Sequence, residues 1–190
     1  SMAKERHQYG AWRAIADLNL VYGPWSAERV APFSPVVQVG NPRWSDHFDA
    51  PIPSLLDLNP NFDSSKRTLL YLPTWEELSS LDEFAEAIAA LREDYNLLFA
   101  PHHNSRRFES ERTAAAMRAI CGNTATVTSF DVGHLIRASD VVLSDFSGAI
   151  FDAILFEKPV LLLQSDALNN IGRKFGPESI EFQRREEIGP

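Results

Sequence analysis

An α/β fold, in which helices cover both faces of a parallel sheet, is predicted by three observations. Short apolar runs alternate with helical patterns from Thr68 to Leu163. Several of these runs, such as Val141–Leu143, are apolar at consecutive positions, which is typical of strands buried on both faces. Polar loops follow three of the expected strands, and the carboxyl ends of parallel strands meet at one edge of a sheet. We therefore expect a ligand site at that edge.

The first third of the chain has a less regular pattern. Residues 4–17 carry apolar positions with helical recurrence, and Leu18–Tyr22 and Val36–Val39 are interpreted as short strands. Between the two strands, Ser26–Val30 has the pattern of one or two helical turns. The stretch from Asp49 to Lys66 is rich in Pro, Asn, Asp and Ser, which predicts a surface loop or a linker.

The rest of the chain supplies the strands and helices of the predicted sheet. Strands are expected at Thr68–Leu72, Asn96–Ala100, Thr124–Ser129, Val141–Leu143 and Pro159–Leu163, and helices at Glu109–Cys121, Asp131–Arg137 and Ala149–Phe156. Ser80 and Glu83 have the spacing of a capping box and predict one more helix, with Phe84, Ile88 and Leu91 on its apolar face. From Gln164 onward we expect mostly loop with some helix.

The turn Ser144–Gly148 lies between an expected strand and an expected helix. The first N–H groups of a helix have no internal partner and lie at the positive end of its dipole, so this arrangement binds anions. We expect Ser147 to be the N-cap and Gly148 to lie just inside the first turn. We interpret the turn as the site of the pyrophosphate of a nucleotide-activated substrate. The alternative is that Ser147 only caps a core helix.

The composition excludes several classes of function. The 190 residues include 18 basic and 26 acidic side chains, and a net charge of −8 argues against binding to nucleic acid. No apolar run has the length of a membrane span. The single cysteine, Cys121, has no partner for an internal disulfide and no zinc-ligand spacing, which indicates a reducing compartment.

Five short motifs occur in a fixed order: Gly40–Arg43 with Asp46, Tyr71–Trp75, the loop at His102, Ser144–Ser147, and Ile150–Asp152 followed by Lys158 and Pro159. Together they resemble the C-terminal half of the CDP-glycerol glycerophosphotransferases, which build teichoic-acid-like polymers. The resemblance covers residues 36–166 and implies a Rossmann-like sheet that forms one half of a GT-B fold. Residues 1–35 are then the tail of a preceding domain or an interdomain junction, and residues 36–190 are the domain that binds the nucleotide donor.

The resemblance also implies an activity. Glycerol phosphate is transferred from CDP-glycerol to a hydroxyl of a polymer or glycan in cell-surface polymer synthesis, and CMP is released. No cofactor and no metal are expected. An N-terminal acceptor domain carrying a catalytic histidine is implied but missing from this chain, which should bind the donor weakly and catalyse little alone. The family acts at the inner membrane face, so we expect a cytoplasmic protein that is peripheral at that face in its full-length form.

The motifs assign the site residues position by position. His102 is the expected catalytic residue, and the residues expected to bind the substrate are Arg43, Thr74, His102, Asp145, Ser147 and Gly148. Asp152 is expected to accept hydrogen bonds from loop N–H groups behind the phosphate turn. Two alternatives stay open, namely a salt bridge between Arg43 and Asp46 and a role for Asp145 in orienting the turn.

The chain departs from the family pattern at three places. Gly148 stands where the family has a second serine, and Phe146 stands where it has a tyrosine. Ala100 and His103 flank His102 where a lysine and a proline are usual, so either histidine can be the one that contacts the donor.

Two other functions fit the same sheet. A nucleotide-sugar glycosyltransferase would place the phosphates of its donor in the same turn. A non-catalytic, flavodoxin-like binding module would have no affinity for nucleotides.

Overall fold

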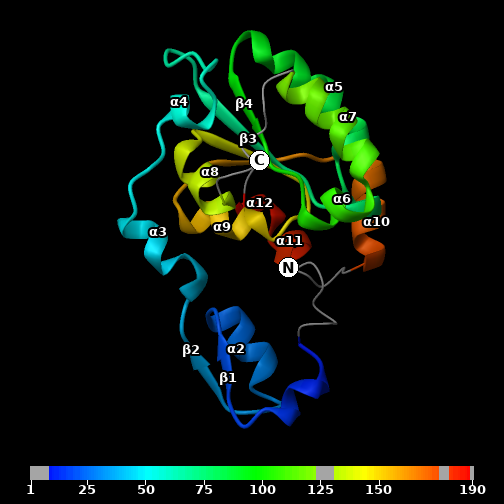
Figure 1. Ribbon diagram of the computed structural model, residues 1–190. Helices are drawn as coiled ribbons and strands as arrows, with labels where there is room; N and C mark the ends of the chain where they lie inside the picture. The colour runs from blue at the N-terminus through cyan, green and yellow to red at the C-terminus, as the bar shows by residue number, and fades with distance from the viewer. Residues whose placement is uncertain (1–8, 123–130, 176–179, 189–190) are drawn as a thin grey trace.

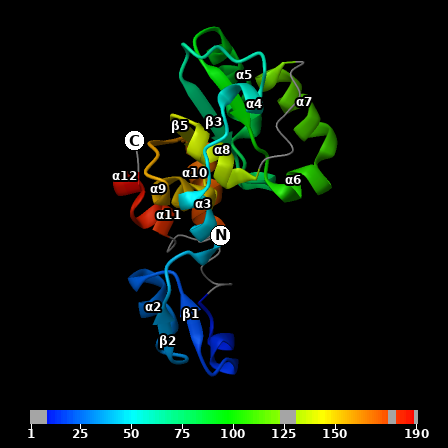
Figure 2. The same ribbon diagram turned by 60° about the vertical axis from the view of Figure 1, so that its left-hand side comes forward.

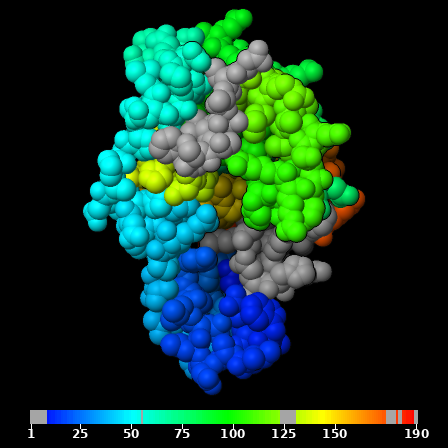
Figure 3. All heavy atoms as spheres, in the orientation of Figure 1, coloured from blue at the N-terminus to red at the C-terminus, as the bar shows by residue number. Residues whose placement is uncertain are grey.

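The computed structural model describes residues 9–122, 131–175 and 180–188. A small N-terminal unit lies at one end of a larger α/β body (Figure 1; Figure 2). In the space-filling view the small unit, in blue, projects from the body (Figure 3). The strand expected at Thr124–Ser129 lies outside the described residues.

The small unit contains two short parallel strands. After a 3-10 helix, η2 (Ala11–Ile15), strand β1 (Asn19–Val21) pairs with β2 (Val36–Gln38), and helix α2 (Pro24–Val30) connects them. Val21, Ala27 and Val30 form its buried core. Strand β2 pairs with β1 and not with the larger sheet. The division into residues 1–35, as the tail of a preceding domain or an interdomain junction, and residues 36–190, as the donor-binding domain, stays a proposal.

The chain then crosses to the larger body through short elements. These are η3 (Pro42–Trp44), α3 (Ser45–Asp49) and α4 (Leu55–Leu58). The region from Asp49 to Lys66 was expected to be a loop or linker. Helix α3 ends at its first residue and α4 lies inside it, and the rest of this region has no regular structure.

The larger body contains a four-stranded sheet. Its strands are β3 (Thr68–Leu72), β4 (Asn96–Phe99), β5 (Val141–Ser144) and β6 (Val160–Leu162), in the order β4-β3-β5-β6, and all neighbours are parallel. The four strands agree with the predicted ones to within one residue at each end. The prediction of a parallel sheet is confirmed.

Helices cover both faces of the sheet, as the alternation of side chains along β3 requires. Leu70 and Leu72 belong to a core formed with α8 (Val132–Ala138) and α9 (Ala149–Leu155). Leu69 and Tyr71 belong to a second core on the opposite face, formed with α5 (Leu81–Ala90) and α7 (Ser110–Cys121). The remaining elements are η4 (Glu76–Leu78), η5 (Leu91–Glu93), α6 (His103–Phe108), α10 (Asp166–Phe175), α11 (Ile180–Gln183) and α12 (Arg185–Ile188).

Two local predictions are wrong. Ser80 lies at the N-cap position of α5 but makes no side-chain cap hydrogen bond, because its hydroxyl donates to Asp145. The paired residue, Glu83, accepts a hydrogen bond from Ser165 instead. The region after Gln164 is mostly helical where it is described, in α10 to α12.

Within the described ranges, no helix combines the length and the apolar character needed to cross a membrane.

Candidate functional site

A cleft of about 740 Å³ opens at the carboxyl edge of the large sheet. This volume lies in the range of about 300–1,000 Å³ found for small-molecule sites. Its wall is formed by Tyr22, Gly40, Asn41, Arg43, Leu72, Pro73, Ala100, Pro101, His102, His103, Arg106, Asp131, Val132, Leu135, Ser147, Gly148, Ala149, Phe151, Asp152 and Leu155. The ends of three strands, the start of α9 and the segment after β2 therefore meet in one place.

The topology explains why the cleft lies there. From β3 the chain moves to β4 on one side, and it later returns to β5 on the other side of β3. The chain therefore leaves the carboxyl ends of β3 and β5 in opposite directions, and open α/β sheets bind ligands at such a switch point. Leu72 and Pro73 at the end of β3 and Ser147 after β5 line the cleft at this point.

Asp145 is the centre of the hydrogen-bond network that shapes the edge. Its side chain is completely buried and accepts hydrogen bonds from the N–H groups of Thr74, Ser80 and Phe146 and from the Ser80 hydroxyl, at 2.6–3.1 Å. Burial raises the pKa of the Asp145 carboxyl, and the hydrogen bonds from Ser80, Thr74 and Phe146 act in the opposite direction. The network ties the loop after β3 and the start of α5 to the turn after β5.

Two expected substrate-binding residues do not reach the cleft. Asp145 does not line it, because its carboxylate is enclosed by hydrogen-bond donors from the protein. Its contacts are those of a residue that orients the turn. Thr74 is also buried and outside the lining, and its N–H group is one of those that Asp145 binds.

Ser147 and Gly148 do line the cleft, where the phosphate turn was expected. The predicted N-cap is wrong by one residue, because α9 begins at Ala149 and its N-cap is Gly148. The Ser147 hydroxyl instead accepts a hydrogen bond from the N–H group of Ala149 at 3.3 Å. Gly148 has an ordinary helical φ of −60°, so its backbone conformation does not require glycine.

His102 also lines the cleft, in a fixed orientation. Its Nδ1 accepts a hydrogen bond from the N–H group of Asn104 at 3.2 Å, so the proton of the neutral ring is on Nε2. The ring is nearly parallel to that of Trp75, with centroids 5.8 Å apart. The centroids of the His102 and His103 rings are 4.1 Å apart. Both histidines line the cleft, so the choice between them stays open.

Arg43 and Arg106 bring two guanidinium groups to the cleft. The Arg43 guanidinium lies 4.2 Å from the centroid of the Trp44 ring, and no ion pair joins Arg43 to Asp46 in the described part of the chain. The expected alternative, a salt bridge between those two residues, is therefore wrong. Arg106 lies on α6, one turn after the His102 loop, and its place in the cleft was not predicted.

Asp152 lines the cleft, but its partners differ from the expected loop N–H groups. Oδ1 accepts hydrogen bonds from the indole N–H of Trp44 at 2.6 Å and from the side-chain amide of Asn41 at 3.3 Å. The carboxylate thus anchors the segment after β2 to α9. Gly40, which begins this segment, has a φ of +69°, a conformation that favours glycine.

Arg185, whose role was not predicted, supports the turn after β5. This side chain is 9% exposed and donates hydrogen bonds to the carbonyl oxygens of Asp145, at 3.3 Å, and Leu163, at 3.1 Å. Its guanidinium also lies 4.8 Å from the centroid of the Phe146 ring. An exposed-looking arginine in a polar tail carries no pattern that would reveal this role.

The chain is similar to one protein family and to several solved structures. The model of the CDP-Glycerol:Poly(glycerophosphate) glycerophosphotransferase family matches residues 33–170. No curated protein matches the chain.

The solved structures agree in fold. The wall teichoic acid polymerase TagF has 17% identity and a TM-score of 0.54, over 90% of this chain and 45% of that one. A variant of TagF with CDPG has 18% identity and a TM-score of 0.55, over 89% and 43%. S. aureus MnaA with UDP has 18% identity and a TM-score of 0.53, over 93% and 52%. The chain therefore spans 43–52% of the length of these solved chains.

Proposed function

Because the chain belongs to the CDP-glycerol:poly(glycerophosphate) glycerophosphotransferase family, we propose that its cleft binds the nucleotide-activated donor CDP-glycerol. The observation that carries the proposal is the meeting of Arg43, His102 and Arg106 with the turn residues Ser147 and Gly148 in one cleft at the topological switch point. Guanidinium groups, an imidazole N–H group and a serine hydroxyl donate hydrogen bonds to phosphate oxygens. A diphosphate is the ligand that uses all of them.

The proposed reaction is a phosphoryl transfer. A hydroxyl oxygen of the acceptor attacks the phosphorus that bears the glycerol and loses its proton to a base. The bond from this phosphorus to the bridging oxygen breaks, and CMP leaves with that oxygen. In this proposal the two arginines and the Nε2–H group of His102 stabilise the negative charge that accumulates on the phosphates and on the leaving CMP. Asp145, Asp152 and Arg185 hold the surrounding loops in place.

We further propose that this chain is the donor-binding half of a larger transferase for cell-surface polymers. The matched solved chains are about twice as long, which leaves room for an acceptor-binding part. In that arrangement the complete enzyme works in the cytoplasm at the inner membrane face, and the chain alone binds its donor weakly.

A nucleotide panel tests the proposal. Melting temperatures are measured with CMP, CDP, CDP-glycerol, UDP and UDP-sugars, for the wild type and for Arg106→Ala. Arg107→Ala is the matched control, because Arg107 is the next residue of α6 and is exposed outside the cleft lining. We expect CDP-glycerol and CDP to raise the melting temperature of the wild type and of Arg107→Ala, and to have a smaller effect on Arg106→Ala.

Each other outcome points to a different function. A larger shift with UDP-sugars supports a nucleotide-sugar glycosyltransferase. No shift with any nucleotide, at millimolar concentration, contradicts donor binding and favours a non-catalytic module. An equal effect of the two arginine substitutions would contradict the role of the cleft.

A further inference from the structure

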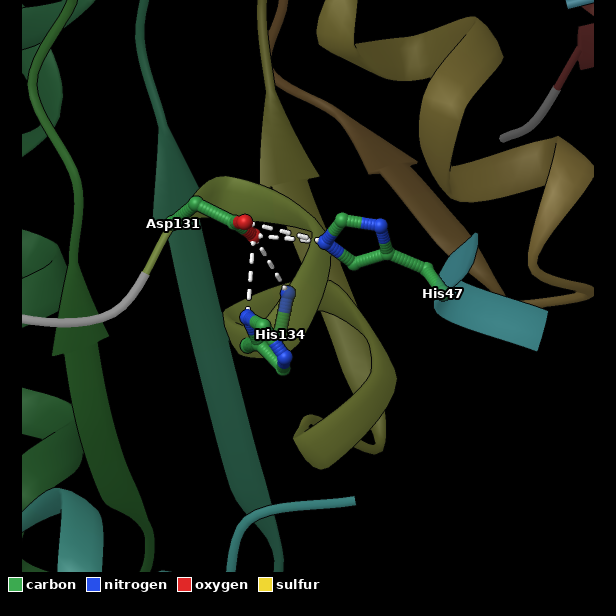
Figure 4. A group of neighbouring side chains, drawn as sticks. All are labelled: His47, Asp131 and His134. Atoms are coloured by element: carbon green, nitrogen blue, oxygen red, sulfur yellow. Dashed lines mark hydrogen bonds and ion pairs between the residues drawn. The ribbon is translucent and has the colours of Figure 1, made fainter. Parts of the chain in front are cut away.

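Three side chains with metal-binding groups meet at the rim of the cleft. His47 belongs to α3, Asp131 is the N-cap of α8, and His134 lies in the first turn of α8. Figure 4 shows the Asp131 carboxylate facing both His47 and His134, with dashed lines to each. Nε2 of His47 lies 2.9 and 3.0 Å from the two carboxylate oxygens, and Nδ1 of His134 lies 3.1 Å from one of them. One ligand atom from each residue lies within 4.8 Å of the others.

The chemistry of this group suits a transition-metal ion. Zn²⁺ is bound by imidazole nitrogens and carboxylate oxygens at about 2.0–2.2 Å, so neighbouring ligand atoms in a tetrahedral site lie about 3.3–3.5 Å apart. The separations of 2.9 and 3.0 Å between Nε2 of His47 and the carboxylate oxygens are those of hydrogen bonds, and the 3.1 Å between Nδ1 of His134 and Asp131 is that of an ion pair. The three ligand atoms lie within 4.8 Å of one another, so small shifts of these side chains would admit an ion. Mg²⁺ and Ca²⁺ prefer sites built from oxygen atoms alone.

The surrounding packing holds the three ligands in place before any ion arrives. The Trp44 ring packs edge-on against the His47 ring, with centroids 4.9 Å apart, and the two histidine rings are 4.8 Å apart. Gly133 permits the approach of α3 to α8, because a Cβ atom there would lie 2.7 Å from Cδ2 of His47. The N–H group of His134 donates to Asp131 at 3.1 Å and fixes the carboxylate.

The group is also accessible. The side chain of Asp131 is 51% exposed, whereas those of His47 and His134 are 15% and 29% exposed. An ion can therefore enter from the side of Asp131, which also lines the cleft. The two imidazoles and the carboxylate supply three protein ligands, which leaves the fourth position of a tetrahedral ion open to water.

We propose that His47, Asp131 and His134 bind one divalent transition-metal ion of the zinc class, which links α3 to α8. The ion would fasten the segment between the small N-terminal unit and the large sheet. The metal site shares Asp131 with the lining of the cleft, but the proposal does not rest on the binding of CDP-glycerol, and nucleotide affinity plays no part in its test. An ion that binds only the folded chain also stabilises that chain.

Metal titrations of the full chain test the proposal. After treatment with EDTA, Zn²⁺ is titrated by calorimetry and Co²⁺ by visible absorption and by quenching of tryptophan fluorescence. We expect one ion per chain, an increase in melting temperature with Zn²⁺, and no saturable binding of Mg²⁺. His47→Gln, Asp131→Asn and His134→Gln should each weaken Zn²⁺ binding by at least about tenfold.

Two matched variants control for nearby charge and for histidine itself. Asp46→Asn removes an exposed acid next to His47, and His103→Gln removes an exposed histidine elsewhere in the cleft. Both should keep the wild-type affinity for Zn²⁺, and circular dichroism checks that every variant is folded. The proposal is overturned if no 1:1 binding of Zn²⁺ or Co²⁺ occurs, or if folded Asp131→Asn and His47→Gln bind as tightly as the controls.

Discussion

Replacing Asp145 with alanine is expected to lower the free energy of unfolding by about 4 kcal/mol. The carboxylate accepts hydrogen bonds from three backbone N–H groups and one hydroxyl, and it is completely buried. At about 1 kcal/mol for each hydrogen bond, their loss gives that total. Asp145→Asn keeps one accepting oxygen of two and should cost about half as much.

Urea unfolding followed by circular dichroism measures the difference. The control is Asp46→Asn, which removes an exposed acid and should change the free energy of unfolding by less than about 0.5 kcal/mol. The slope against urea should stay the same in all variants, because the surface exposed on unfolding is unchanged. If Asp145→Ala is as stable as Asp46→Asn, the reasoning about the buried carboxylate is refuted. If Asp145→Ala does not fold, Asp145→Asn provides the same test.

Three further predictions concern single side chains. Trp44→Phe removes the indole N–H donor to Asp152 and should cost about 1.5–3 kcal/mol in urea unfolding, and an unchanged midpoint would contradict this. Gly133→Ala places a Cβ atom 2.8 Å from the Trp44 ring and should lower the free energy of unfolding by about 1–3 kcal/mol. Gly23→Ala is the control and should be more stable than Gly133→Ala, because its Cβ atom meets nothing within 4 Å. Burial raises the pKa of the Cys121 thiol to about 11. Iodoacetamide at pH 8 should therefore alkylate the folded chain far more slowly than the urea-unfolded chain, and the rate for the folded chain should rise until the pH nears that pKa. Equal rates for the folded and unfolded chains would refute the effect of burial.

Much of the fold could be predicted from the sequence, because the strands of the large sheet are buried on both faces. Consecutive apolar residues such as Leu69–Leu72 and Leu97–Phe99 are all buried, and such runs are typical of strands covered on both faces. The amount of helix after Gln164 was underestimated because most of the residues there are polar. The signal was present in α10, where Leu168 and Ile171 are three residues apart and lie on the inner side of the helix.

The candidate site was predicted in its location and less well in its contacts. The strand-end loops indicated Ser147, Gly148 and His102, which all line the cleft. Contacts across the chain could not be inferred, because spacing shows only neighbours along one element. The hydrogen bond from Trp44 to Asp152 joins residues 108 positions apart in the sequence. In the proposed metal site, His47 and Asp131 are 84 positions apart.

The serine assignments show a related limit. A serine before a helix is a common N-cap, and this pattern predicted caps at Ser80 and Ser147. In the structure the Ser80 hydroxyl donates to a buried carboxylate, and Ser147 lies one residue before the cap. The hydrogen bond to Asp145 decided the role of the Ser80 hydroxyl, and the geometry of the turn decided the position of Ser147.

The binding of a diphosphate by the cleft is tested most directly by comparing CDP with CMP. Dissociation constants are measured by NMR titration, which detects weak binding, for the wild type and for Arg43→Ala, with Arg173→Ala, an exposed arginine on α10 outside the cleft, as control. We predict that CDP binds the wild type at least about tenfold more tightly than CMP, a difference of about 1.4 kcal/mol, and that Arg43→Ala removes most of this difference. Equal affinities for CDP and CMP, or the same preference for CDP in Arg43→Ala as in Arg173→Ala, would contradict the account.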